Sequence, residues 1–177
     1  MRKPRELKEG ARYHVTARAN NKAMILGKAP MKELFIAVVR RAKTKYRFQI
    51  ENFCIMGNHI HLIIRPGKGE SLSAIMRWIM SVFAMTYNRI CGTCGHVWGG
   101  RFFSRIIRCF HELVLAFGYI DGNPVRANQV ENPMDWIYGG LWHARAGCRE
   151  ILDGVADWMR PIFPERAPFL LGYSPSD

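Results

Sequence analysis

The spacing of hydrophobic residues changes period along the chain and predicts where strands and helices lie. In residues 11–19 apolar and polar side chains alternate and strand-forming residues dominate, which predicts a first β-strand. In residues 30–46 the apolar residues Leu34, Val38 and Ala42 recur at every fourth position. That period predicts an amphipathic α-helix, one face of which packs against the rest of the protein.

Two further strands and a second helix follow. Residues 48–56 and 59–65 are both typical of strands, and the Gly-Asn pair between them indicates a tight turn, so together they predict a β-hairpin. Ser71 stands directly before a long apolar stripe. It therefore predicts the N-cap of a helix that ends near Asn88.

The last predicted elements are a strand within residues 102–107 and a helix over residues 111–120 that ends before an Asn-Pro pair. The order β-α-β-β-α-β is the split βαβ arrangement of ferredoxin-like folds. We therefore predict an α+β fold: a four-stranded antiparallel sheet with helices on one face, the other face left for ligands, plus a C-terminal helix. We assign residues 1–130 to this domain and expect residues 131–177 to form a tail packed on it.

Composition places the chain among globular proteins. The 177 residues are 49% hydrophobic and 23% charged, which is typical of one domain. No stretch approaches the ~20 apolar residues that cross a bilayer, and the basic N-terminus lacks the apolar segment of a signal peptide. The five cysteines are irregularly spaced, which argues against a disulfide framework. We expect a cytoplasmic protein with reduced thiols and no membrane partner.

The balance of charge indicates a class of partner. The chain has 26 Lys and Arg residues against 14 Asp and Glu residues, a formal net charge of +12. Groups of cations occur within residues 2–12, 40–47 and 101–108. This excess favours a polyanion such as nucleic acid, because each neutralised phosphate releases condensed counterions. A basic protein without such a ligand and a binder of membrane surfaces are the alternatives that composition leaves open.

The sharpest chemical signal is His59-Ile60-His61 in the third predicted strand. Side chains alternate along a strand, so we expect the two imidazoles together on the open face of the sheet, and Ile60 and the following apolar residues on the face against the helices. Two neighbouring imidazoles on one face can bind one divalent metal ion. A pair of solvated histidines would give the same pattern, so the motif by itself leaves both interpretations open.

A second signal lies at the end of the last predicted helix. If that helix continues far enough, Tyr119 and Asn123 stand at positions i and i+4 and share one face. A phenol and an amide oxygen would then reach the same phosphate. The alternative is an interfacial tyrosine followed by a turn-forming Asn-Pro pair.

A weaker pattern concerns a second type of metal. Cys91 and Cys94, together with His96 and Cys109, have the residue types of a zinc site. Only one Cys-x-x-Cys pair is present, however, which makes zinc the lesser interpretation of these residues.

Aromatic and basic residues near the fourth predicted strand are candidates for DNA contacts. Trp98 and Phe103 would either stack on unpaired bases or belong to the core. Arg101 is a candidate for a phosphate contact. Three more candidates for DNA contact lie at the end of the first strand: Arg18, Asn20 and Asn21.

Four segments, in order, resemble a known family. Residues 56–62 resemble the "HUH" strand, His-hydrophobic-His, of tyrosine transposases that act on single-stranded DNA. These include insertion-sequence transposases and those associated with repetitive extragenic palindromes. Residues 13–21 resemble the family's first strand and loop, residues 95–102 its Gly-His-aromatic-Gly-Arg-Phe segment, and residues 119–127 its Tyr-Ile-x-x-Asn-Pro-Val-Arg-Ala helix end.

The chain departs from the family pattern at three glycines. Gly57 stands where a proline is usual, and Gly99 where glutamine is common. Gly122 replaces an apolar residue and weakens the helix directly before Asn123. This last change bears on where Asn123 is placed relative to Tyr119.

The resemblance implies a role for several residues. His59 and His61 would bind Mg²⁺ or Mn²⁺, with Asn123 as a third ligand. Tyr119 would attack the scissile phosphate, release a 3′-hydroxyl and keep a 5′-phosphotyrosyl link to the DNA. The C-terminal helix of the fold would thus carry the nucleophile. Tyr87, near the end of the second predicted helix, is the alternative nucleophile.

The implied function is DNA transposition, by a metal-dependent endonuclease and strand transferase that acts on single-stranded DNA flanked by hairpins. Two other classes fit parts of the pattern. One is a non-catalytic domesticated protein that binds single-stranded or hairpin DNA, and the other is a metal-dependent hydrolase that uses water. The presence of His59, His61 and Tyr119 together favours the first function. The resemblance is compatible with a monomer and with a homodimer.

Overall fold

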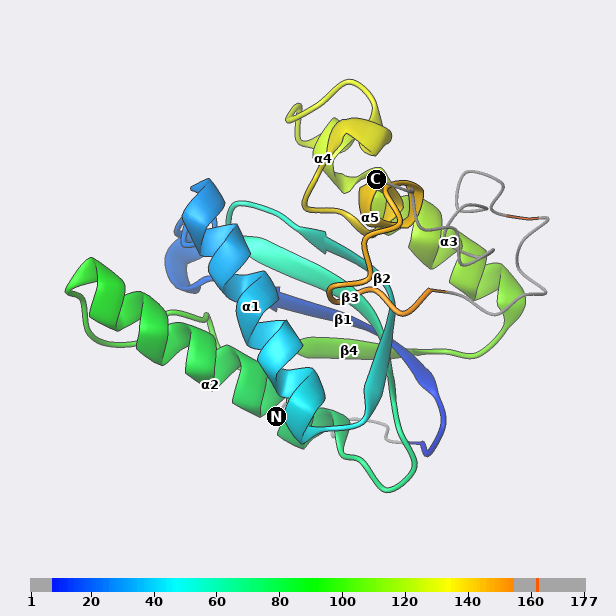
Figure 1. The fold of residues 1–177 in the computed structure, drawn as a ribbon, viewed down its shortest axis with the longest axis horizontal. Helices are drawn as coiled ribbons and strands as arrows, with labels where there is room; N and C mark the ends of the chain where they lie inside the picture. Colours follow the sequence, from blue (N-terminus) through cyan, green and yellow to red (C-terminus); the bar gives the residue numbers. More distant parts are fainter. Residues whose placement is uncertain (1–7, 155–161, 163–177) are drawn as a thin grey trace.

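The computed structural model describes residues 8–154 and residue 162. Its centre is one antiparallel sheet with the strand order β2-β3-β1-β4, which confirms the predicted four-stranded sheet (Figure 1). This order arises because β1 pairs on both sides, with β3 and with β4. The strands are β1 (Arg12–Arg18), β2 (Phe48–Ile55), β3 (His59–Pro66) and β4 (Phe103–Ile107).

Two long helices, α1 (Ala29–Lys45) and α2 (Leu72–Cys91), pack against each other and cover one face of the sheet (Figure 1). The start of α2 is the predicted one, because the Ser71 hydroxyl accepts a hydrogen bond of 3.3 Å from the Ala74 amide. Gly92, in the left-handed conformation at φ 62°, ends the helix. Among the described residues, no helix is both long and apolar enough to cross a membrane.

The side chains of β3 alternate between the two faces of the sheet. Ile60, Leu62 and Ile64 are buried in the core that the sheet forms with α1 and α2, as the sequence predicts. Ile63 belongs to a separate apolar cluster on the opposite face. The alternation of β3 therefore gives each face its own core.

The second face of the sheet is partly covered by α3 (Phe110–Asp121), the helix that follows β4. Its apolar side packs against β2, the residue after β2, and β3. The cluster consists of Leu113, Phe117, Ile120, Cys54, Met56 and Ile63. The face that the sequence analysis leaves for ligands is therefore open only where α3 does not cover it.

The break between α3 and the short helix α4 (Asn123–Arg126) lies at Gly122. A Cβ atom at this position would lie 2.7 Å from the Arg126 guanidinium and 3.1 Å from the Gly118 carbonyl oxygen. The glycine therefore both ends α3 and leaves room for Arg126 to fold back over the helix end. The helix stops where the sequence indicates a weakening.

Residues 131–154 pack along β2, which is an edge strand of the sheet. This segment contains a short 3-10 helix, η2 (Pro133–Asp135), and α5 (Gly140–Arg145). The Ile55 amide of β2 donates to the Tyr138 carbonyl oxygen at 3.0 Å, and the Asp153 amide donates to the Ile50 carbonyl oxygen at 2.9 Å. The rest of the expected tail, apart from residue 162, lies outside the described residues, so the proposed domain boundary stays a prediction.

Candidate active site

His59 and His61 lie next to each other on β3, with ring centroids 5.0 Å apart. This agrees with the prediction that they share one face. His61 is only 4% exposed, however, whereas the sequence analysis placed both rings on an open face. The burial arises because Tyr119 of α3 and His14 of β1 lie against the His61 ring, at centroid distances of 5.5 Å and 5.2 Å.

The hydrogen bonds of the two imidazoles engage the same nitrogen, Nδ1, of each ring. His61 Nδ1 lies 3.0 Å from the Thr16 hydroxyl oxygen and 3.0 Å from His14 Nε2. His59 Nδ1 lies 2.7 Å from the Asn58 side-chain oxygen. A metal-ligating histidine commonly donates its second N–H to such a partner, which fixes the ring and its tautomer. With Nδ1 engaged in both rings, Nε2 is the nitrogen that would bind a ligand, and in His59 it is also the nitrogen that remains to bond the Asn123 side chain.

Both imidazoles favour the neutral form at neutral pH. Burial, together with the nearby charges of His14 and His59, lowers the pKa of His61 to about 3. Burial also lowers the pKa of His59, as does the charge of Arg18, while a hydrogen bond to Asn123 acts in the opposite direction. A neutral imidazole keeps the lone pair that a metal ion requires.

Tyr119 reaches the histidine pair from the last turn of α3. Its ring centroid lies 5.5 Å from that of His61 and 6.0 Å from that of His14. The residue is 49% exposed, so a ligand can approach it from solvent. Tyr87 lies on α2, where its ring stacks on Phe83 of the core at 5.9 Å. Of the two candidate nucleophiles, Tyr119 is therefore the one that the fold brings to the histidines.

Two residues of α4 hold the end of α3 at the site. Asn123 Nδ2 donates a hydrogen bond of 3.0 Å to the Tyr119 carbonyl oxygen, which agrees with the predicted i, i+4 proximity. Because this bond uses the amide nitrogen, the amide oxygen is the atom left to accept from His59. The Arg126 guanidinium lies over the Tyr119 ring, 4.6 Å from its centroid, and also donates to the Tyr119 carbonyl oxygen. A permanent positive charge therefore lies beside the phenol ring.

A small cavity of about 290 Å³ opens beside Tyr119, between α3 and the β1 and β4 strands. Its polar wall includes His14, Arg105 and Glu112, and the last two form an ion pair of 3.1 Å. Its apolar wall consists of Ile107, Leu115 and Ala116. The cavity gives a ligand a route from solvent to the phenol and to the imidazole behind it.

The predicted DNA-contact residues fall in two places. Arg18 ends β1 close enough to both histidines for its charge to lower their pKa values. Asn20 and Asn21 follow in the 3-10 helix η1 (Asn20–Lys22), whose last residue accepts a hydrogen bond of 3.3 Å from the Asn58 side chain, next to His59. Arg101 lies elsewhere, in the loop before β4, where it lines a separate cavity of about 630 Å³ against α2.

The structure separates the two aromatic candidates for base stacking. Trp98 is 7% exposed and donates Nε1 to the Met80 carbonyl oxygen at 2.9 Å, so it belongs to the core, whereas Phe103 is 66% exposed.

The residues proposed for zinc lie at the surface. Three of the four are exposed cysteines: Cys91, Cys94 and Cys109. Within the described part of the chain, no group of three His, Cys, Asp or Glu side chains is placed to hold a metal ion. The zinc interpretation thus has no structural support.

Four residues of the site were missed by the sequence analysis. His14 and Thr16 contact His61 because β1 pairs with β3 in a register that sets Thr16 opposite His61. Alternation along β1 puts both on one face, but the register between strands is not visible in the sequence. Asn58 stood inside the quoted motif as a turn residue only. Arg126 reaches Tyr119 from seven positions away because Gly122 allows the chain to turn back.

Fold and site together define an α+β protein with a ferredoxin-like sheet, on which a pair of imidazoles meets an exposed helix-borne tyrosine. The family model described as "Transposase IS200 like" matches residues 8–111. The chain belongs to this family of IS200-like transposases. The matched region contains His59 and His61 and ends before Tyr119.

Two similar proteins support the assignment. A REP-associated tyrosine transposase of Haemophilus influenzae (strain ATCC 51907 / DSM 11121 / KW20 / Rd) is 25% identical over 117 residues. That alignment spans 60% of this chain and 66% of the relative, slightly less than two thirds of its length. The solved structure of a REP-associated tyrosine transposase bound to a REP hairpin superimposes with a TM-score of 0.70 at 22% identity, covering 85% of this chain and 88% of that chain. The latter likeness concerns the fold.

Proposed function

We propose that the protein is a metal-dependent endonuclease and strand transferase for single-stranded DNA flanked by hairpins, with Tyr119 as its nucleophile. The observation that carries the proposal is the placement of an exposed tyrosine ring 5.5 Å from the buried ring of His61. A protein that only binds DNA has no need for a phenol beside a pair of neutral imidazoles. Membership of the IS200-like transposase family agrees with this chemistry.

The residues of the site fit a divalent metal ion. The lowered pKa values of His59 and His61 favour neutral imidazoles, and because Nδ1 of each ring already has a partner, Nε2 would bind the ion. Asn123 supplies an amide oxygen next to His59. Two imidazoles and one oxygen leave room for phosphate and water ligands, which suits Mg²⁺ or, with its greater preference for nitrogen, Mn²⁺. A bound cation would offset negative charge that develops on the scissile phosphate.

The chain's own groups would carry out the bond exchange. The Tyr119 oxygen forms a bond to phosphorus while the bond from phosphorus to the 3′-oxygen breaks. The phenolic proton is lost and the departing 3′-oxygen gains a proton, so the products are a 3′-hydroxyl and a 5′-phosphotyrosyl link. Arg126, fixed over the ring, would attract the phosphate. Attack by another 3′-hydroxyl on the same link would join two strands.

Hairpin DNA is the substrate class that we infer for this site. The net charge of +12 suits a polyanion, and the family's REP-associated member was solved with a REP hairpin bound to it. Arg18, whose charge acts on both histidines, and Asn20 and Asn21, in the turn bonded to Asn58, are proposed to contact the strand next to the cleavage site. Arg101 is proposed to bind a more distant phosphate, because it lines a different cavity.

Incubation with labelled single-stranded hairpin DNA and Mn²⁺, followed by denaturing electrophoresis, tests the proposal. The proposed enzyme gives a covalent protein–DNA adduct that survives denaturation. A hydrolase that activates water would give free DNA ends without an adduct, and a pure binder would leave the DNA intact. Either of those two results would refute the proposed function.

A further inference from the structure

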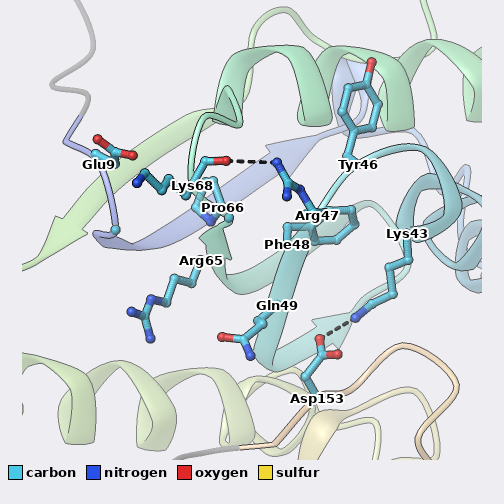
Figure 2. Close-up of a pocket in the computed structure, with 12 residues that line it drawn as sticks. Glu9, Lys43, Tyr46, Arg47, Phe48, Gln49, Arg65, Pro66, Lys68 and Asp153 are labelled. Carbon is cyan, nitrogen blue, oxygen red and sulfur yellow. Dashed lines mark hydrogen bonds and ion pairs between the residues drawn. The ribbon is translucent and has the colours of Figure 1, made fainter.

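A second basic region lies at the opposite end of β3 from the histidines. There the end of β3, the turn between α1 and β2 and part of the N-terminal segment surround a cavity of about 710 Å³ (Figure 2). Cationic side chains from separate parts of the chain line this cavity: Lys43, Arg47, Arg65 and Lys68. We call these four residues and the cavity between them the basic hollow.

Hydrogen bonds between the turn and the end of β3 hold the walls of the basic hollow. The Gly67 amide donates to the Arg47 carbonyl oxygen at 2.8 Å, and the Arg47 guanidinium donates to the Lys68 carbonyl oxygen at 3.3 Å. A Cβ atom at Gly67 would lie 2.8 Å from the same Arg47 oxygen, so this close approach depends on glycine. The Arg47 amide also donates to the Glu70 carboxylate at 2.9 Å. The hollow is therefore an ordered feature of the fold.

The lining carries an excess of positive charge. Against the four cations stand two carboxylates, Glu9 and Asp153. Asp153 is already neutralised, because it forms an ion pair with Lys43 that Figure 2 shows at one side of the hollow. Arg65 and Lys68 are exposed, and within residues 8–154 neither forms an ion pair. Arg47 forms an ion pair of 3.7 Å with Glu70, so Arg65 and Lys68 are the two cationic side chains of this lining that remain for a ligand.

The basic hollow is separate from the candidate active site. Arg65 follows His59 by six residues on the same strand, so the two lie about 20 Å apart at ~3.3 Å per residue. Between them, Ile63 is covered by α3. Burial raises the pKa of Glu51, although the hydrogen bonds from Arg12, at 2.8 Å and 2.7 Å, and the charge of Arg65 act in the opposite direction. Among residues 8–154, Glu51 therefore pairs with Arg12 and not with Arg65.

We propose that the basic hollow is a second site for the DNA backbone, which binds phosphates up to about six nucleotides from the cleavage site, at ~3.4 Å per nucleotide of a helical strand. This inference rests on the proposed function. Exposed cations such as Arg65 and Lys68 bind a small free anion weakly, because solvent screens them. A DNA already held at the active site reaches them at a high effective concentration. A long nucleic acid is therefore the ligand that gains most from this placement.

The test compares the affinities of single-stranded DNA of about 4 and about 24 nucleotides, of which only the longer spans both sites comfortably; backbone contacts do not depend on sequence. In the variant R65A/K68A, affinity for the long DNA should fall roughly tenfold, while affinity for the short DNA stays near that of the wild type. The salt dependence with long DNA should weaken by about 0.7 in log–log slope for each lost phosphate contact. A matched control, R41A/R89A, removes two exposed arginines of α1 and α2 that line neither the basic hollow nor the cavity beside Arg101, and it should keep the length dependence.

Each outcome decides the proposal. Equal losses for short and long DNA, equal losses in the two variants, or no loss in R65A/K68A would overturn it. The charge-preserving variant R65K/K68R should bind long DNA as the wild type does, and a loss there would also contradict a backbone contact. Covalent adduct formation is measured separately. An absent adduct with intact length dependence refutes the proposed function alone, whereas a normal adduct without length dependence refutes the basic hollow alone.

Discussion

The partners of His61 Nδ1 offer a direct test of the proposed metal site. Thr16 and His14 each lie 3.0 Å from this nitrogen, so that together they fix the ring and leave Nε2 for the metal. We consider the variants Thr16→Val and Thr16→Val with His14→Phe. Valine matches the shape of threonine without its hydroxyl, and phenylalanine keeps a ring beside Tyr119 without its nitrogens.

The expected magnitude follows from the hydrogen bonds that are lost. One such bond contributes about 0.5–1.5 kcal/mol, and about 1.4 kcal/mol corresponds to a tenfold change in affinity. Thr16→Val should therefore weaken metal binding by up to about tenfold, because His14 still holds the ring. The double variant should weaken binding by about 10- to 100-fold, the range found for second partners of metal-bound histidines. Both variants should fold, because the side chains of Thr16 and His14 are only partly buried.

Binding of Mn²⁺ can be followed by the loss of the electron paramagnetic resonance signal of the free ion, with thermal unfolding as a check of the fold. Thr44→Val is a suitable control, because that hydroxyl is exposed on α1 and bonds only the Arg41 carbonyl oxygen, at 2.9 Å. The control should bind Mn²⁺ as the wild type does. If the folded double variant binds Mn²⁺ as tightly as the wild type, the argument that these two residues orient His61 is wrong.

Two further predictions concern histidines. His59→Ala and His61→Ala should each abolish metal-dependent cleavage. Only His61→Ala should also lower the free energy of unfolding, by roughly 1–3 kcal/mol, because His61 is buried and hydrogen-bonded. Thermal unfolding measures this loss as a lower midpoint. Cleavage by either variant at ordinary Mg²⁺ concentration would contradict the metal site. His143 is 4% exposed against the Phe53 ring, and burial lowers its pKa to about 4. The unfolded chain therefore binds a proton that the folded chain does not between pH values of about 6.5 and 4, so stability is complete above this window and falls as pH decreases through it, by up to about 3 kcal/mol. Urea unfolding should show a flatter pH profile for His143→Phe, and an unchanged profile would refute this cause.

The sequence predicts those parts of the fold that depend on neighbours along the chain. The alternation in β3 correctly separates Ile60, Leu62 and Ile64 from the histidines, and Ser71 marks the start of α2. Local spacing also brings Tyr119 and Asn123 together across one helical turn. These features follow from the geometry of a single strand or helix.

The remaining features depend on contacts between distant segments. His61 is buried because α3 crosses the second face of the sheet, and nothing local to β3 indicates that. His14 and Thr16 enter the site through the register of β1 against β3, which a shift of one residue would reverse. The basic hollow joins residues of α1, β3 and the loop after β3, so its cations stood in the sequence as separate groups.

The most direct test of the account is adduct formation by Tyr119→Phe with hairpin DNA and Mn²⁺. The change removes one hydroxyl and keeps the ring that packs between His61 and Arg126, so binding should match the wild type. No covalent adduct should form, because the missing oxygen is the atom proposed to join phosphorus. Tyr87→Phe, the matched control on α2, should form the adduct normally. An adduct that persists in Tyr119→Phe and maps to another residue would contradict the assignment of the nucleophile.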